Sequence, residues 1–85
     1  MLKSVEKLAK GLATRVGNHS VDVDNWQGIS HFKYHGNEIC TVYHNLRNFE
    51  LHHCGFSSSP STSRALNSYE KCFKDAGYVL TYRGE

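Results

Sequence analysis

The chain has 85 residues, with ten Lys and Arg against eight Asp and Glu and a formal net charge of +2. A chain this short has room for one thin hydrophobic core, so we take residues 1–85 as a single domain. The near balance of charge lacks the marked basic excess of general nucleic-acid binders. Six histidines would make the chain more cationic near pH 6.

The cysteines and the amino-terminal residues bear on the cellular compartment of the protein. Cys40, Cys54 and Cys72 form no C-x-x-C pair. The amino end opens into an amphipathic pattern instead of the apolar segment of a signal peptide. No apolar run approaches the roughly 20 residues that cross a bilayer. We therefore expect a cytoplasmic protein with free thiols and no membrane contact.

The first predicted element is an amphipathic helix that continues to Val16. Ser4 suits its amino-terminal cap, and Gly17-Asn18 suits its stop. The Lys-rich side of this helix would also suit a membrane surface, but a helix docked on a sheet with solvated lysines is the simpler interpretation. Its apolar stripe recurs at three- and four-residue steps and consists of Val5, Leu8, Ala9, Leu12, Ala13 and Val16.

Strand patterns follow this helix. Residues 21–24 alternate Val and Asp, which indicates a short strand. Their acidic residues lack the Gly and the final Glu of a calcium loop at the required spacing. Three further strands are predicted over residues 29–35, 38–44 and 49–54, with Gly36-Asn37 as a two-residue hairpin turn.

The second helix has a clear start and end. Ser59 is the predicted cap, Pro60 fits the first turn, and Gly77 ends the helix. Glu70 and Lys74 form a predicted i,i+4 ion pair. Residues 78–82 form a last strand. The predicted fold is α+β: an antiparallel three- to five-stranded meander with two amphipathic helices packed on one face, in the order α-(β)-βββ-α-β.

The turn at Gly36-Asn37 divides the strand side chains between two faces, and a one-residue slip would exchange the two sets. The face toward the helices is predicted to hold Phe32, Tyr34, Ile39, Thr41, Tyr43, Phe49, Leu51 and His53. The opposite face is predicted to hold His31, Lys33, His35, Glu38, Cys40, Val42, His44, Glu50, His52 and Cys54.

This second, polar face is the predicted functional surface. Its His and Cys residues could converge on zinc, but no pair has the spacing of a compact structural zinc site, so we expect neither a metal nor a cofactor. An ordinary solvated face, a docking face for a partner protein and a homodimer interface all fit the pattern. The candidate partner-binding residues are His31, Lys33, His35, His44, His52 and Arg64.

Catalytic motifs are missing from the sequence. It contains no recognisable nucleophile motif with an oriented base, no Walker loop, no G-x-G-x-x-G and no H-E-x-x-H. We therefore expect a protein that is not an enzyme. Residues 59–64, at the start of the second helix, could bind an anion through backbone amides, hydroxyls and Arg64, although helix capping is the simpler interpretation.

The segment from Tyr34 to Asn67 resembles a group of small tailed-phage accessory proteins. The matching residues are Tyr34, His35, Asn37, Ile39, Gly55, Phe56, Ser61, Thr62, Arg64 and Asn67. The segment covers less than half of the chain, and its serine-rich residues 57–63 depart from the threonine-rich family pattern. The resemblance implies a phage or prophage origin and a small protein that binds a host protein in the host cytoplasm, for example as an inhibitor of a host defence or nucleic-acid enzyme.

The α-β-β-β-α order also resembles the double-stranded-RNA-binding domain. That family has a lysine cluster at the start of its second helix, where this chain has Ser61-Thr62-Ser63-Arg64, so the resemblance is one of topology. A small nucleic-acid-binding module is nevertheless the alternative function. Its predicted contacts are His31, Lys33, His35, Arg64 and Lys71.

Overall fold

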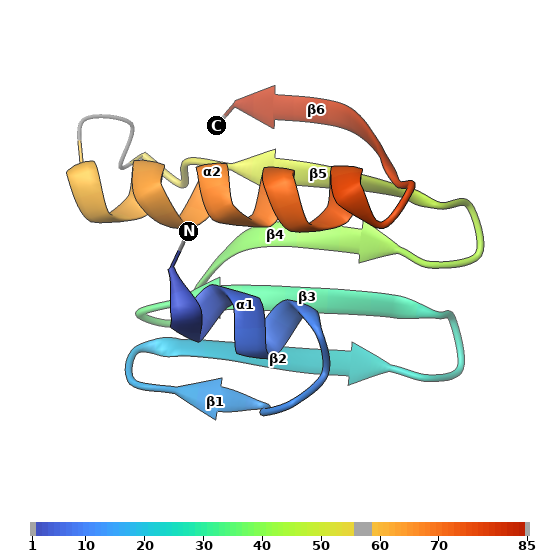
Figure 1. Cartoon of the computed structure of the whole chain (residues 1–85), viewed down its shortest axis with the longest axis horizontal. Coiled ribbons are helices and arrows are strands. Elements are labelled where there is room, and N and C mark those ends of the chain that lie inside the picture. Colours follow the sequence, from blue (N-terminus) through green and yellow to red (C-terminus); the bar gives the residue numbers. More distant parts are fainter. Residues whose placement is uncertain (1, 56–58, 85) are drawn as a thin grey trace.

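The computed structural model describes residues 2–55 and 59–84 and confirms the predicted α+β class. Two helices, α1 (Lys3–Ala9) and α2 (Pro60–Asp75), lie on one face of a six-stranded sheet (Figure 1). The strands are β1 (Arg15–Val16), β2 (His19–Asp24), β3 (Ile29–Tyr34), β4 (Asn37–Tyr43), β5 (Asn48–His52) and β6 (Val79–Gly84). They lie side by side in chain order.

The sheet differs from the predicted meander in two ways. β1 is an additional strand, formed by residues that the sequence pattern assigned to the first helix. β6 is parallel to β5, whereas all other neighbouring strands are antiparallel. The parallel pairing follows from α2, which carries the chain back across the sheet so that β6 enters in the same direction as β5.

α1 is shorter than its apolar stripe predicts. It ends because Gly11 adopts a left-handed conformation with φ +74°, and the Leu12 N–H donates to the Lys7 carbonyl at 2.9 Å. Leu12, predicted to be in the core, is therefore 74% exposed. The predicted cap at Ser4 is also wrong: Leu2 is at the cap position, and no side chain caps the helix.

The predicted boundaries of α2 are confirmed. The Ser59 hydroxyl accepts a hydrogen bond from the Thr62 N–H at 3.4 Å, and Pro60 is the first helical residue. Gly77 follows the helix with φ +91°. The predicted Glu70–Lys74 ion pair is present at 2.8 Å.

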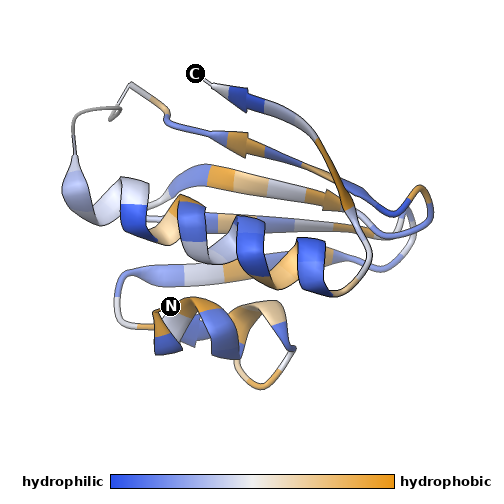
Figure 2. Ribbon diagram, turned by 45° about the horizontal axis from the view of Figure 1, so that its top comes forward, coloured by the Kyte–Doolittle hydropathy of each residue, from blue (hydrophilic) through white to orange (hydrophobic). Residues whose placement is uncertain are grey.

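The core lies between the helices and the sheet. α1 packs on β1 and β2, while α2 packs on β4, β5 and β6. Figure 2 shows apolar and polar residues interleaved along helices and strands, as expected of elements with one buried side. The buried core residues are Val5, Leu8, Phe32, Ile39, Cys40, Val42, Phe49, Leu51, Ala65, Leu66, Tyr69 and Phe73.

A bulge in β4 changes which side chains face the helices. The hairpin turn is His35-Gly36, one residue earlier than predicted, with φ of +52° and +81°. The pairing then shifts by one residue, so that Phe32 lies opposite Cys40 instead of Ile39. Because side chains alternate along a strand, every residue of β4 after the bulge lies on the face opposite to the predicted one.

As a result of the bulge, five residues lie on the face opposite to the predicted one. Cys40 and Val42 are in the core instead of on the polar face. His44 also lies on the helix side, where its ring bonds to Ser30 and Tyr78. Thr41 and Tyr43 were predicted to face the helices but lie on the face without helices.

Some predictions fall outside the described residues. Phe56, Ser57 and Ser58, part of the predicted corner and serine-rich stretch, belong to this group. Of the helices in the described ranges, neither α1 nor α2 has the length and apolar character needed to cross a bilayer.

Candidate functional site

The face of the sheet that carries no helix, the open face, presents a continuous row of polar side chains. One row of paired residues crosses five strands: Asp22, His31, Thr41, Glu50 and Tyr82 lie opposite one another in turn. Such cross-strand neighbours are close enough to interact directly. By the strand register, the open face consists of Arg15, Ser20, Asp22, Asp24, Ile29, His31, Lys33, Glu38, Thr41, Tyr43, Asn48, Glu50, His52, Val79 and Tyr82.

Glu38 is held by two neighbours on this face. Its Oε2 lies 2.9 Å from His31 Nδ1 and also accepts a hydrogen bond from the Thr41 hydroxyl. Partial burial opposes ionisation of Glu38, but the hydrogen bonds from Thr41 and His31 outweigh it, so the pKa of Glu38 lies below its ordinary value. This carboxylate is therefore charged and fixed in position at neutral pH.

Glu50 is held in a similar way. The Tyr43 hydroxyl donates to Glu50 Oε1 at 3.2 Å, and His52 Nε2 lies 3.5 Å from the same oxygen. The His52 ring also lies near the Tyr82 ring in a tilted arrangement, with 5.5 Å between ring centroids. Two carboxylates on the open face thus each have one histidine and one hydroxyl as neighbours.

The open face is acidic at neutral pH. Lys33 Nζ lies 2.8 Å from Asp22 Oδ2, so its charge is already matched by one carboxylate. Glu38 and Glu50 have only histidines as cationic partners. Within the described part of the chain, four carboxylates on this face, Asp22, Asp24, Glu38 and Glu50, stand against Lys33 and Arg15.

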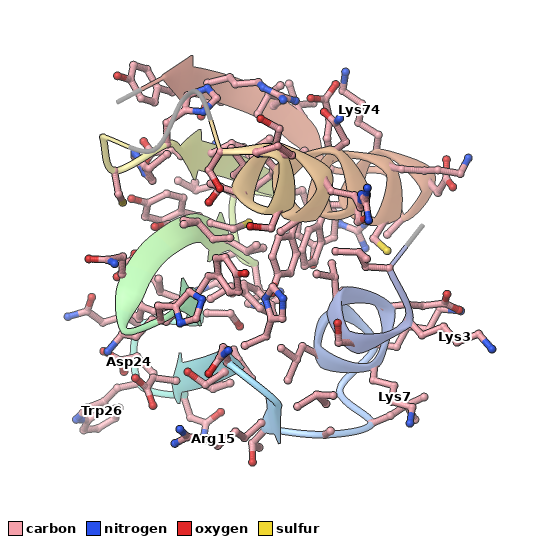
Figure 3. All side chains as sticks on the ribbon, turned by 90° about the vertical axis from the view of Figure 1, so that its left-hand side faces the viewer. Lys3, Lys7, Arg15, Asp24, Trp26 and Lys74 are labelled. Carbon is pink, nitrogen blue, oxygen red and sulfur yellow. The ribbon has the colours of Figure 1, made fainter. Side chains whose placement is uncertain are left out.

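Trp26 lies on the same side of the sheet. Figure 3 shows Trp26 and Asp24 on the side away from the helices, opposite Lys3 and Lys7. The Trp26 side chain is 96% exposed. Its turn is ordered, because Asp24 Oδ1 accepts from the N–H groups of Trp26 and Gln27 at 3.1 Å each.

The predicted site residues do not all gather in one place. His31, Lys33 and His52 lie on the open face, as predicted. His35 is in the hairpin turn at one end of the sheet. His44 and Arg64 lie on the helix side, because of the bulge in β4 and because Arg64 is part of α2.

Sequence reasoning missed five of the site residues whose contacts are described above: Asp22, Trp26, Thr41, Tyr43 and Tyr82. Thr41 and Tyr43 were missed because of the bulge. Ile39 and Cys40, two adjacent apolar residues before Thr41, were the available signal for it, because strict alternation does not bury both. The signal for Trp26 was a large aromatic residue between two polar ones, Asn25 and Gln27, in a turn.

The thiols and histidines do not form a metal or nucleophile centre in the part of the chain that the structure describes. Within residues 2–55 and 59–84, no three His, Cys, Asp or Glu side chains gather closely enough to hold a metal ion. Burial raises the pKa of the Cys40 thiol, and burial together with the nearby Glu38 charge raises that of Cys54. Neither thiol is therefore poised as a thiolate.

The residues of the phage resemblance converge around one small cavity. It has a volume of about 220 Å³ and lies between the β3–β4 hairpin and the start of α2. Six matching residues line it: Tyr34, His35, Asn37, Ile39, Ser61 and Thr62. Comparison with family models, curated proteins and solved structures finds no match to this chain.

Proposed function

We propose that this chain is a non-catalytic accessory protein of phage or prophage origin that binds a host protein through the open face. One observation carries the proposal: the almost fully exposed Trp26 lies on the same side as an ordered, acidic sheet surface. Trp and Tyr dominate the binding energy of protein interfaces. Tyr43 and Tyr82 on the open face add two further aromatic side chains.

The chemistry of the open face indicates the kind of partner. Asp22, Asp24, Glu38 and Glu50 outnumber Lys33 and Arg15, so the surface complements a cationic one. Enzymes that act on nucleic acids present such cationic surfaces to phosphates. An acidic face that occupies one of these surfaces would inhibit the enzyme, which agrees with the function that the phage resemblance implies.

The open face is also prepared for binding. Glu38 and Glu50 are each fixed by a histidine and a hydroxyl, and Lys33 is fixed by Asp22. Side chains that are already ordered lose little further entropy when a partner docks. The cavity lined by Tyr34, His35 and Thr62 brings together parts of the resemblance that are distant in the sequence.

The proposal is tested by capture from lysate of the bacterial host with three forms of the protein. Wild type and Leu12→Ser should enrich the same host protein, whereas Trp26→Ser should lose it. Leu12 is the matched control, because it is a large exposed apolar residue in a loop after α1, on the helix side. Enrichment of nothing beyond a denatured control, or equal capture by all three forms, would contradict the proposal.

A nucleic-acid-binding module remains the alternative function. One observation favours the helix side of the sheet as its binding surface. Among the described residues, α1, α2 and Arg83 contribute six Lys and Arg against three carboxylates. Lys3, Lys7 and Arg64 form no ion pair with any described residue. In gel-shift assays at low salt, the double variant Lys3→Gln/Lys7→Gln should then lose nucleic-acid binding, whereas Lys33→Gln should keep it. Absence of binding to both DNA and RNA by the wild-type protein would remove this alternative.

A further inference from the structure

One end of the sheet is left uncovered on its helix side. α1 ends at Ala9, so it does not reach the end of β2. Val23 pairs with the buried Ser30 and faces the helix side, yet it is 52% exposed. A cavity of about 330 Å³ opens at this place between α1 and the sheet. This volume is at the lower end of the range for small-molecule sites.

The cavity has apolar walls. α1 and the loop after it contribute Leu8 and Ala13, and the sheet contributes Val21, Val23 and Phe32. Leu8 and Phe32 also belong to the core, so these walls are rigid. Such walls suit an alkyl chain or a small ring, because burying the apolar surface of such a ligand away from water is favourable in free energy.

A chain of hydrogen bonds ends in this cavity. Tyr78 OH lies 2.9 Å from His44 Nδ1, and His44 Nε2 lies 2.7 Å from Ser30 Oγ. His44 and Ser30 line the cavity, and Ser30 is buried. Of the two hydroxyls that bond to His44, Tyr78 is the better donor, because a phenol is a stronger acid than an aliphatic alcohol.

The donation from Tyr78 to His44 determines whether the Ser30 hydroxyl can donate a hydrogen bond to a ligand. If Tyr78 donates to Nδ1, the neutral His44 ring carries its proton on Nε2 and donates to Ser30. The Ser30 hydroxyl then has its own proton free to donate, and its donor strength is raised by the two bonds behind it. A buried hydroxyl proton needs an acceptor, and a ligand oxygen in the cavity would be one.

We propose that this cavity binds a small monocarboxylate with an apolar body, whose carboxylate accepts a hydrogen bond from Ser30. Lys10 lies at the rim of the cavity and adds a positive charge near the entrance, although it also pairs with Glu6 at 2.9 Å. The apolar body of the ligand would lie against Val21 and Val23. This inference does not depend on the open face, which is on the other side of the sheet.

The first test is a titration of the wild-type protein with hexanoate, followed by NMR. Saturable shifts are expected for the His44 ring and for the methyl groups of Val21 and Val23. His52, on the open face, is the internal reference and should not move. Hexanol, which has the same chain without the charge, should bind about tenfold more weakly, since hydrogen bonds to charged groups are the stronger kind. Hexylamine should not bind.

Variants locate the site independently. Ser30→Ala should weaken hexanoate binding about tenfold or more. Val23→Glu should abolish it by placing a like charge in the cavity, and it should fold because Val23 is half exposed. Val79→Glu is the matched control, because Val79 is an exposed strand valine outside this cavity. Absence of saturation in the wild type, equal binding of hexanol, or unchanged binding in Val23→Glu would each overturn the proposal.

Discussion

The same strands form both sides of the sheet, but one side packs against the helices and the other carries no helix. The side under the helices is mostly apolar, with one cavity at the end beyond α1, where Ser30 and His44 lie, and a second between the β3–β4 hairpin and the start of α2. The open face is mostly polar, and its charged residues Asp22 and Lys33 pair with each other, while Glu38 lies against His31. Polar side chains on an uncovered sheet face are thus ordered by cross-strand neighbours without a covering helix.

Two histidines show the difference most directly. His44 and His52 lie near the ends of neighbouring strands, β4 and β5. His44 is bonded through both ring nitrogens to hydroxyls beside the core. His52 lies on the open face, between the Glu50 carboxylate and the Tyr82 ring. The first histidine contributes to packing, and the second is available to a partner.

The largest expected effect is on the closed side. Leu66→Asp places an unpaired charge at a fully buried position between α2 and the sheet. The cost is several kcal/mol against a total stability of about 5–10 kcal/mol, so the variant should not fold. Leu12→Asp, at a position that the helical stripe predicted to be buried, should change stability by no more than about 0.5 kcal/mol. Thermal unfolding of both variants checks this, and a cooperative transition near that of wild type for Leu66→Asp would show that α2 packs differently.

A smaller effect distinguishes two tyrosine hydroxyls. Tyr78→Phe leaves His44 Nδ1 without its partner beside the core and should cost about 1–2 kcal/mol. Tyr43→Phe removes a bond to Glu50 on the open face and should cost about 0.5 kcal/mol or less. Urea unfolding measures both values. Equal costs would mean that the two hydroxyls lie in equivalent environments, and would contradict the difference between the two sides of the sheet.

Acid should act on the open face through Glu38. The pKa of Glu38 is lower in the folded state than its ordinary value of about 4.3, so its charged form stabilises the fold. This contribution is complete above pH 4.3 and is lost as the pH falls through the lower, folded-state pKa. Glu38→Gln should therefore lose less stability than wild type between about pH 5 and pH 3. Identical pH profiles in urea unfolding would contradict the assigned shift.

The smallest effect concerns the exposed ion pair on the open face. Asp22→Asn removes the partner of Lys33, but both side chains are in contact with solvent, so the melting temperature should barely change. The same substitution should matter more for binding, because it reduces the acidic charge presented to a cationic partner. A large loss of stability that persists at high salt would show that this pair is not screened by solvent.

The sequence predicted those parts of the fold that depend on local chemistry. Ser59, Pro60 and Gly77 specify the ends of α2 by capping and backbone conformation, which need no tertiary contact. The same kind of local signal at Gly11 ends α1, but the apolar stripe that continues to Val16 concealed it. Half of the predicted site residues, His31, Lys33 and His52, were correctly placed on the open face.

The tertiary structure decided the rest of the site. The strand period of two means that one extra residue at Ile39 turns Cys40, Val42 and His44 toward the core and Tyr43 away from it. Whether an extra residue is tolerated depends on packing against α2 and β5, which local propensity does not report. The parallel pairing of β6 likewise follows from the path of α2 across the sheet, since strand patterns alone carry no direction.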